Sequence, residues 1–568
     1  MKKYSKIIIT GLLLTLFSTA CQNDFLEVKP LGVLDQSSLQ NKIGVNLLLV
    51  GAYSMIDGVQ TNVGSAFSDW QGSACNWVYG EVTADNAVKG SDSNDQPEIA
   101  LIESFNTTPA LIHFRGKWRA VYDGVARSND VLQAADKATD MTAVEKTQAI
   151  AQARFLRGHY HFEAKKMWNN VPYVDDKTYN PAEPNSTKIP NDKDIWPNIV
   201  DDLKFAYDNL PNTWAGQPGR ATKWAAAALL GKAYMFQSKF AEAKPLFEAI
   251  VNSKQYDLMV KFHDNFRSET NNNKESILEV EFSINDGAAI NNNGNRGGTL
   301  NYPYTGSPVT TCCGFFQPTQ SLVNAYKTDS ITGLPDANPN ATDVPGINSQ
   351  TYKGSLDPRL DWTVGRQGIQ YLDWGLHLPG YVRDVAYAGP YSPKKSSPYK
   401  SDIGKTAASN PRQNANNYRM IRYAHVLLML AECEVEIGTV DKAREYVNLI
   451  RTRASNPAGF VQTPVNQPNY KIGTYTTPWA DKVAARDAVR NETRLELAME
   501  GHRFFDLVRW KVADKVINDY ITFQQNKQTY LKGAKFVAGK HEYFPIPQAE
   551  IINSSLDGKP TLKQNPGY

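Results

Sequence analysis

The sequence has few cysteines, no excess of either charge and only one sustained apolar run. That run covers residues 7–17 and is too short to span a bilayer, which needs about 20 consecutive apolar residues. The mean hydropathy of the chain is −0.46. We therefore expect no membrane-spanning helix and a body that lies in water.

Basic and acidic side chains nearly balance, at 61 and 58. Lys2, Lys3 and Lys6 precede residue 21, and without these three lysines the two numbers are equal. A protein that binds nucleic acid electrostatically would carry a basic excess or patch. The composition therefore argues against a nucleic-acid partner.

Common catalytic and metal-binding motifs are also missing. The sequence has no His-Glu-x2-His, no phosphate-binding loop, no Gly-x-Ser-x-Gly and no Cys-x2-Cys. Cys433 lies in an apolar helical pattern and is expected to be a buried small hydrophobe. Cys75, Cys312 and Cys313 can be oxidised in an exported protein, but their state stays open. We predict no catalysis, no cofactor and no metal.

The N-terminus has the features of an export signal. Basic residues precede the apolar run, and the run ends within Leu16-Phe17-Ser18-Thr19-Ala20-Cys21. This segment resembles a bacterial lipobox, whose cysteine becomes the acylated first residue. We expect residues 1–20 to be removed and Cys21 to carry lipid, which would tether the body to a membrane. The alternative is an ordinary secretory peptide with an incidental cysteine.

A helical hairpin is predicted over residues 222–251. Thr222 can cap its first helix, and apolar residues recur at helical spacing on both sides of a break at Ser238–Lys239. The spacing matches part of the tetratricopeptide pattern, Leu230-Gly231-x2-Tyr234 and then Ala243-x3-Phe247. A related spacing returns at Leu430-Ala431 and Ala443-x3-Val447. Two such copies predict a scaffold of paired helices.

The fold class is therefore predicted to be mainly α, a tetratricopeptide-like scaffold with a large loop-rich insertion. Helical patterns occur at about 40–57, 114–136, 143–168, 194–209, 222–251, 419–453 and 480–517. Residues 253–417 are rich in Asn, Gly, Pro and Tyr, and Ser276–Phe282 alternates like a short strand. We expect residues 21–568 to form a single body, with the scaffold at about 40–252 and 418–520. An irregular insertion this long is usually functional.

Several motifs together resemble the SusD/RagB family of outer-membrane lipoproteins. They are Arg154-Phe155-Leu156-Arg157-Gly158-His159-Tyr160, Trp168-Asn169-Asn170-Val171-Pro172-Tyr173, Gly219-Arg220-Ala221-Thr222, Asp357-Pro358-Arg359, Arg422-Tyr423-Ala424, Ile450-Arg451-Thr452-Arg453, Arg490-Asn491-Glu492-Thr493-Arg494-Leu495-Glu496, Glu500-Gly501-His502-Arg503-Phe504-Phe505-Asp506, Pro545-Ile546-Pro547 and the final Asn565-Pro566-Gly567-Tyr568. One departure is His425, where the family pattern usually has glutamate. We interpret it as a local surface change.

The resemblance implies a surface-exposed, lipid-anchored protein of the outer membrane that binds nutrients. Family members resemble a lid over a SusC-like, TonB-dependent barrel transporter, to which they pass ligand. Polysaccharide or oligosaccharide is the usual cargo, and peptide carriers also occur. The resemblance implies neither a cofactor nor catalysis.

Two groups of acidic residues could form a catalytic pair and a calcium site, but a structural role explains each of them better. Glu492, Glu496 and Glu500 recur every four residues among arginines, which is more typical of ion pairs than of a catalytic pair. Asp92 and Asp95 could bind calcium, but their loop lacks the glycine and distal glutamate of an EF-hand. We expect a solvated turn there.

Aromatic residues in polar, glycine-containing segments suggest where a ligand binds. A sugar needs a flat ring beneath its C–H face and polar groups at its edge. The candidate ligand-binding residues are Trp70, Trp77, Tyr79, Asp85, Asn86, Tyr302, Tyr304 and Phe315. The alternative is that these rings fix long loops to the scaffold. We expect the Trp70–Asn86 segment to meet residues 300–316, and Trp77→Ala or Tyr302→Ala to weaken glycan binding without unfolding the protein.

Two other functions stay open at this point. A surface-anchored glycoside hydrolase would bring acids together in a cleft, and a peptide-binding carrier or adaptor would use a groove in place of an aromatic platform.

Overall fold

The structure is a computed structural model that describes residues 36–59, 68–288, 292–304, 312–410 and 412–568. The predicted signal peptide and Cys21 lie outside the described residues. No helix in the described part of the chain is both long enough and apolar enough to cross a membrane.

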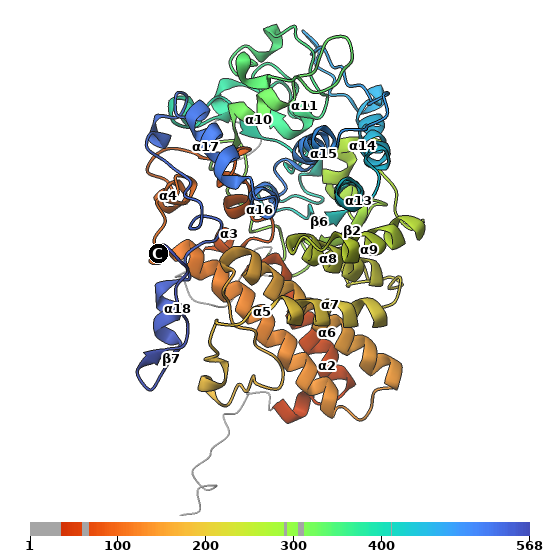
Figure 1. Cartoon of the computed structure of the whole chain (residues 1–568), viewed down its shortest axis with the longest axis vertical. Coiled ribbons are helices and arrows are strands. Elements are labelled where there is room, and N and C mark those ends of the chain that lie inside the picture. Colours follow the sequence, from red (N-terminus) through yellow and green to blue (C-terminus); the bar gives the residue numbers. More distant parts are fainter. Residues whose placement is uncertain (1–35, 60–67, 289–291, 305–311, 411) are drawn as a thin grey trace, which may run out of the picture.

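Paired antiparallel helices form the N-terminal half of the scaffold (Figure 1). They are α2 (Lys42–Tyr53), α5 (Ile112–Lys137), α6 (Ala143–Trp168), α7 (Trp196–Asn209), α8 (Lys223–Phe236) and α9 (Phe240–Asn252). Each helix packs on the next in the order α5, α6, α7, α8 and α9, and α2 packs on α5. The prediction of a mainly α scaffold of helical pairs is confirmed.

Local sequence explains where these helices start and how closely they pack. Thr222 caps α8, its side chain accepting a hydrogen bond from the Ala225 amide. Gly231 lies directly against the Phe247 ring of α9, where an added Cβ would be only 2.5 Å from the ring. The small residue therefore lets α8 and α9 approach, as the tetratricopeptide spacing predicted.

The C-terminal helices continue the scaffold, because α13 packs against both α9 and α15. They are α13 (Tyr423–Ile437), α14 (Val440–Ala454), α15 (Lys482–Leu497), α16 (Arg503–Arg509), α17 (Ala513–Gln524) and α18 (Gln548–Asn553). The helix expected from residue 419 begins at Tyr423, because Tyr418–Arg422 forms strand β6 instead. This strand pairs antiparallel with β2 (Ser276–Val280), the strand that the alternating pattern predicted.

Short elements make up the insertion and the segments around it. They are α3 (Asp69–Gly72), a π-helical turn (Trp77–Val82), β1 (Ala87–Gly90), α4 (Pro97–Glu103), β3 (Phe315–Pro318), α10 (Gln320–Ala325), α11 (Leu360–Thr363), β4 (Val364–Gly365), α12 (Val385–Ala388), β5 (Ser392–Pro393), β7 (Ser555–Leu556) and β8 (Lys559–Pro560). Figure 1 shows α10 and α11 at the end of the molecule opposite α2, α6 and α7. The sheets in the described residues are two-stranded ladders. Loops therefore dominate this end, and the helices beneath hold them in place.

Candidate functional site

Two segments far apart in the sequence meet at the β1–β3 ladder. Gly90 is opposite Phe315, and Val88 is opposite Gln317. Next to the ladder, Trp77 packs on Phe315 and Phe316, with ring centroids 6.3 and 5.6 Å apart. The structure therefore brings the Trp70–Asn86 segment together with the described part of the 300–316 region, at Phe315 and Phe316.

Most of the side chains proposed to contact ligand lie beneath the surface at this junction. Trp77, Tyr79, Asp85, Asn86, Tyr302 and Phe315 are buried, whereas Trp70 and Tyr304 are half-buried. A ring inside the core offers no face to a sugar. The four buried rings therefore lie in the core beneath the loops, whereas Trp70 and Tyr304 reach the surface; the ligand-binding role of the candidate residues stays a prediction.

Asp85 and Asn86 link the N-terminal segment to the C-terminal helices through buried ion pairs and hydrogen bonds. Asp85 binds Arg503 at 2.7 Å and Arg494 at 3.1 Å. Burial opposes ionisation of Asp85, but the two guanidinium groups outweigh it and lower its pKa to about 2. Asn86 accepts a hydrogen bond from Arg494 and donates one to Glu81. These residues join the N-terminal segment to the C-terminal helices.

A charged cluster surrounds the half-buried ring of Tyr304. The Arg383 guanidinium lies over this ring, 5.3 Å from its centre. It binds Asp92 at 2.7 Å and Asp95 at 2.8 Å, and donates a hydrogen bond to Ser91. An arginine thus lies between the two acids that were considered for calcium and pairs with both. We call these five residues the Tyr304 cluster.

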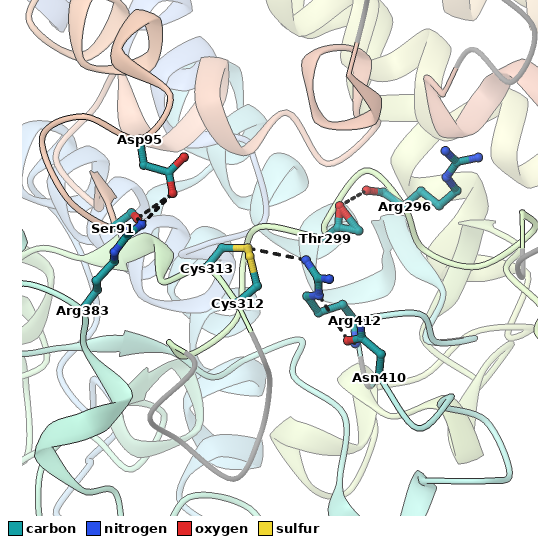
Figure 2. Close-up of a disulfide and its surroundings, with 9 residues drawn as sticks. All are labelled: Ser91, Asp95, Arg296, Thr299, Cys312, Cys313, Arg383, Asn410 and Arg412. Atoms are coloured by element: carbon teal, nitrogen blue, oxygen red, sulfur yellow. Dashed lines mark hydrogen bonds and ion pairs between the residues drawn. A yellow bond between two sulfur atoms is a disulfide. The ribbon is translucent and has the colours of Figure 1, made fainter. Parts of the chain in front are cut away.

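A disulfide between the neighbouring residues Cys312 and Cys313 lies beside this cluster (Figure 2). A Cβ atom added to the next residue, Gly314, would lie 3.5 Å from the Tyr304 Cβ and 3.6 Å from the Arg383 Cβ, so these two side chains pass close to the backbone that follows the disulfide. On the other side, Arg412 donates a hydrogen bond to Cys313 Sγ at 3.5 Å. The open question about the cysteines is answered for this pair, while Cys75 and Cys433 are free.

Two hollows adjoin these segments, and they differ in size. A cavity of about 70 Å³ is lined by Tyr302 and Phe316, and is far smaller than the roughly 300 Å³ at which ligand pockets begin. A groove of about 420 Å³ runs past Asp57, Arg220 and Asn292. Arg296 donates a hydrogen bond to Asn292 and also pairs with Asp69 of α3, which links the groove to the Trp70 segment.

We call the surface formed by the Tyr304 cluster, the disulfide and Arg412 the loop face (Figure 2). Its arginines were not among the predicted residues. They are separated by long stretches of polar loop, and no spacing in the sequence marks Arg383 or Arg412 as a neighbour of Tyr304.

The three regularly spaced glutamates do not share one helix as expected, because α15 ends at Leu497: Glu492 and Glu496 lie in α15 and Glu500 lies beyond its end. All three belong to a buried ion-pair network. Glu496 binds Arg422 at 2.6 Å and Arg359 at 2.9 Å, and it also pairs with Arg453. Burial alone would raise the pKa of Glu496, but the three arginines hold it well below its usual value. The prediction of ion pairs is confirmed, although the partners come from other segments and not from α15 itself. Most of the quoted arginine and glutamate motifs after residue 350 meet here.

Two family models match the chain, and the first of them covers the motifs that meet in this network. Residues 274–568 match the family model described as the SusD family, and residues 24–235 match one described as starch-binding, associating with outer membrane. The chain belongs to the SusD family.

Relatives and solved structures of the SusD type resemble this chain over almost its whole length. SusD-like protein P25 of Formosa agariphila is 23% identical, over 97% of each chain. A SusD-like protein of Bacteroides ovatus is also 23% identical, over 81% of this chain and 83% of its own. A laminarin-binding SusD-like protein has a TM-score of 0.67 at 22% identity, covering 93% of this chain and all of its own. Surface glycan-binding protein A from Bacteroides thetaiotaomicron, solved with laminarihexaose, has a TM-score of 0.61 at 22% identity, covering 92% and 99%.

His425, the departure from the SusD pattern, is buried and not at the surface as we had interpreted it. Its ring packs on His502, with centroids 4.5 Å apart. Burial and the charge of nearby Lys232 lower the pKa of His425 well below its usual value, so the ring is neutral. A neutral histidine here avoids a buried charge that a glutamate would bring.

Proposed function

We propose that this protein is a lipid-anchored glycan-binding protein of the cell surface. It captures polysaccharide or oligosaccharide on the loop face without cleaving it, and passes the ligand to a TonB-dependent barrel transporter of the outer membrane. Membership of the SusD family supports this function, as do structural neighbours described as laminarin-binding and surface glycan-binding proteins. Peptide cargo on the same scaffold is the alternative within this class.

The Tyr304 cluster is the observation that carries the proposal. A half-buried ring beside an arginine and two carboxylates offers an apolar surface with hydrogen-bonding groups at its edge. Sugars need this combination, because their C–H faces are apolar and their rims carry hydroxyls. An open surface of this kind also suits a long polymer better than the small cavity nearby.

The ion-pair network supports binding without catalysis. A glycosidase uses two carboxyl groups that face the scissile bond, one of them often with a raised pKa. Glu496 and Glu500 instead pair with arginine or lysine inside the protein, and their pKa values are lowered. These acids are not placed to donate a proton to a sugar.

Native affinity electrophoresis against a panel of soluble polysaccharides tests the proposal. The panel includes laminarin, starch, xyloglucan and arabinoxylan, and products are followed by chromatography after long incubation. We expect at least one polysaccharide to retard the protein with no new reducing ends. Cleavage of a retained polysaccharide would support the hydrolase alternative, and the absence of any retardation would overturn glycan capture.

The lipid anchor and the transporter require separate tests. We expect Cys21→Ser to leave the exported protein unacylated and released from the outer membrane. A variant that stays membrane-bound would refute the anchor. For hand-over, we expect a tagged protein to copurify from its own outer membrane with a TonB-dependent barrel, and purification of the tagged protein alone would contradict this partner.

A further inference from the structure

Resting on the proposed function, we propose that the Cys312–Cys313 disulfide is itself a ligand-contacting surface of the loop face. One pyranose ring stacks its C–H face on the part of the disulfide that Cys312 exposes, with Arg412 at one edge and the Tyr304 cluster at the other. The ligand class is therefore a glycan with an exposed apolar pyranose face.

The position of the disulfide is the first reason. Cys313 is buried and anchors the pair, whereas Cys312 is half-buried and reaches the surface. Figure 2 shows the pair between Arg412 and the side chains of Ser91, Asp95 and Arg383. Contacts support this arrangement: Arg412 Nη1 donates to Cys313 Sγ, and the Ser91 amide donates a hydrogen bond to the carbonyl of Gly314, the residue after Cys313.

Rigidity is the second reason. A bond between adjacent cysteines closes a small ring that includes one peptide bond, so neither side chain keeps rotamer freedom. Stacking on such a surface costs no side-chain entropy, unlike contact with a long flexible residue. The sulfur atoms are polarisable and only weak hydrogen-bond acceptors, which suits them to C–H groups better than to hydroxyls.

The surrounding charges supply the polar edge. Arg412 Nη1 donates to Cys313 Sγ and its Nε donates to Asn410 at 3.2 Å. A guanidinium carries five N–H donors, and these two bonds use two of them. At the opposite edge, Asp95 accepts bonds from Ser91 and Arg383 and retains acceptor capacity of its own.

Protection from reduction tests direct contact. The native protein is treated with tris(2-carboxyethyl)phosphine, with and without a saturating amount of the polysaccharide that retards it, and new thiols at positions 312 and 313 are alkylated and quantified by peptide mass spectrometry. We expect bound polysaccharide to slow reduction of the disulfide by about tenfold, which corresponds to ~1.4 kcal/mol in the activation free energy of reduction. A panel member that does not bind serves as the control. An unchanged rate under saturation would overturn the proposal.

A variant provides the second measurement. We expect the double substitution Cys312→Ser and Cys313→Ser to weaken binding of the same polysaccharide by about tenfold with an unchanged melting temperature, while Cys75→Ser binds normally. Normal binding by the double variant would overturn the disulfide contact and leave glycan capture intact. If the double variant does not fold, the protection experiment on the native chain decides. If no polysaccharide binds the native protein, the proposed function fails and this proposal fails with it.

Discussion

At the scale of single residues, aromatic side chains have different roles according to how deeply they are buried. Trp77 is 1% exposed and packs on Phe315 and Phe316, whereas Tyr304 lies at the surface under Arg383. Both occur in polar, glycine-containing segments of the sequence. Composition alone could not separate them, because depth depends on which loop lies above the other.

Truncation of these two rings should therefore give opposite results. We expect Trp77→Ala to destabilise the protein by about 3–5 kcal/mol, because it removes a large buried side chain and leaves a cavity. We expect Tyr304→Ala to keep the native melting temperature and to weaken glycan binding about tenfold. Tyr304→Phe, which retains the ring, is the control and should bind almost normally. Denaturant titration and affinity electrophoresis give the two readouts; a stable Trp77→Ala would contradict its assignment to the core.

Asp85 gives a pH dependence that can be checked. Its pKa is about 2 in the folded protein against an ordinary value of 3.8, so the folded state favours the ionised carboxyl. The resulting stability, about 2 kcal/mol, is fully present above pH 5 or so and is lost as the pH falls from about 4 towards 2. We expect unfolding free energies of the native protein to fall more steeply than those of Asp85→Asn between about pH 5 and pH 3. Parallel curves would show that Asp85 does not carry this effect.

At the scale of elements, the sequence fixes the scaffold by the size of residues at helix contacts. Gly231 allows α8 to lie against the Phe247 ring, and Gly124 allows α5 to lie against the Tyr160 ring of α6 in the same way. Neither glycine has a positive φ, so the reason is space and not backbone conformation. The helical pairs are thus set by local pattern and by one close contact at each pair.

Two glycine substitutions distinguish close packing from helix propensity. We expect Gly231→Ala to destabilise the protein by about 1–3 kcal/mol, because the new methyl group overlaps the Phe247 ring. Gly51 of α2 has open space at its Cβ position, so Gly51→Ala should stabilise by up to about 1 kcal/mol through helix propensity. Thermal unfolding monitored by circular dichroism measures both. Equal effects of the two substitutions would show that α8 and α9 are less tightly packed than the structure has them.

At the scale of the whole molecule, one buried network joins the insertion to the C-terminal half of the scaffold. Arg359 comes from the insertion, Arg422 from β6, Arg453 from α14 and Glu496 from α15. Asp85 adds a similar link between the N-terminal segment and α16. Because these charges are buried, each depends on its partners, and the network fixes the insertion to the C-terminal helices.

Removal of the central charge should weaken the entire protein. We expect Glu496→Gln to cost about 3–5 kcal/mol, because it leaves buried arginines without their shared partner. Glu445, which pairs with Lys442 at the surface of α14, is the matched control. Glu445→Gln should change stability by less than about 1 kcal/mol, since exposed ion pairs contribute little. Similar melting temperatures for the two variants would contradict the central position of Glu496.

The sequence by itself determined the helical pairs, the strand at β2, the family and the ion-pairing of the α15 glutamates, because these depend on short-range periodicity and on motifs that can be read in order. Only the tertiary structure decided which partners those glutamates have, which aromatic rings reach the surface, and that Arg383, Arg412 and the disulfide share one face with Tyr304. The physical reason is that burial and proximity across an irregular insertion depend on how distant loops stack on the helices. A loop carries no periodicity from which that stacking can be predicted.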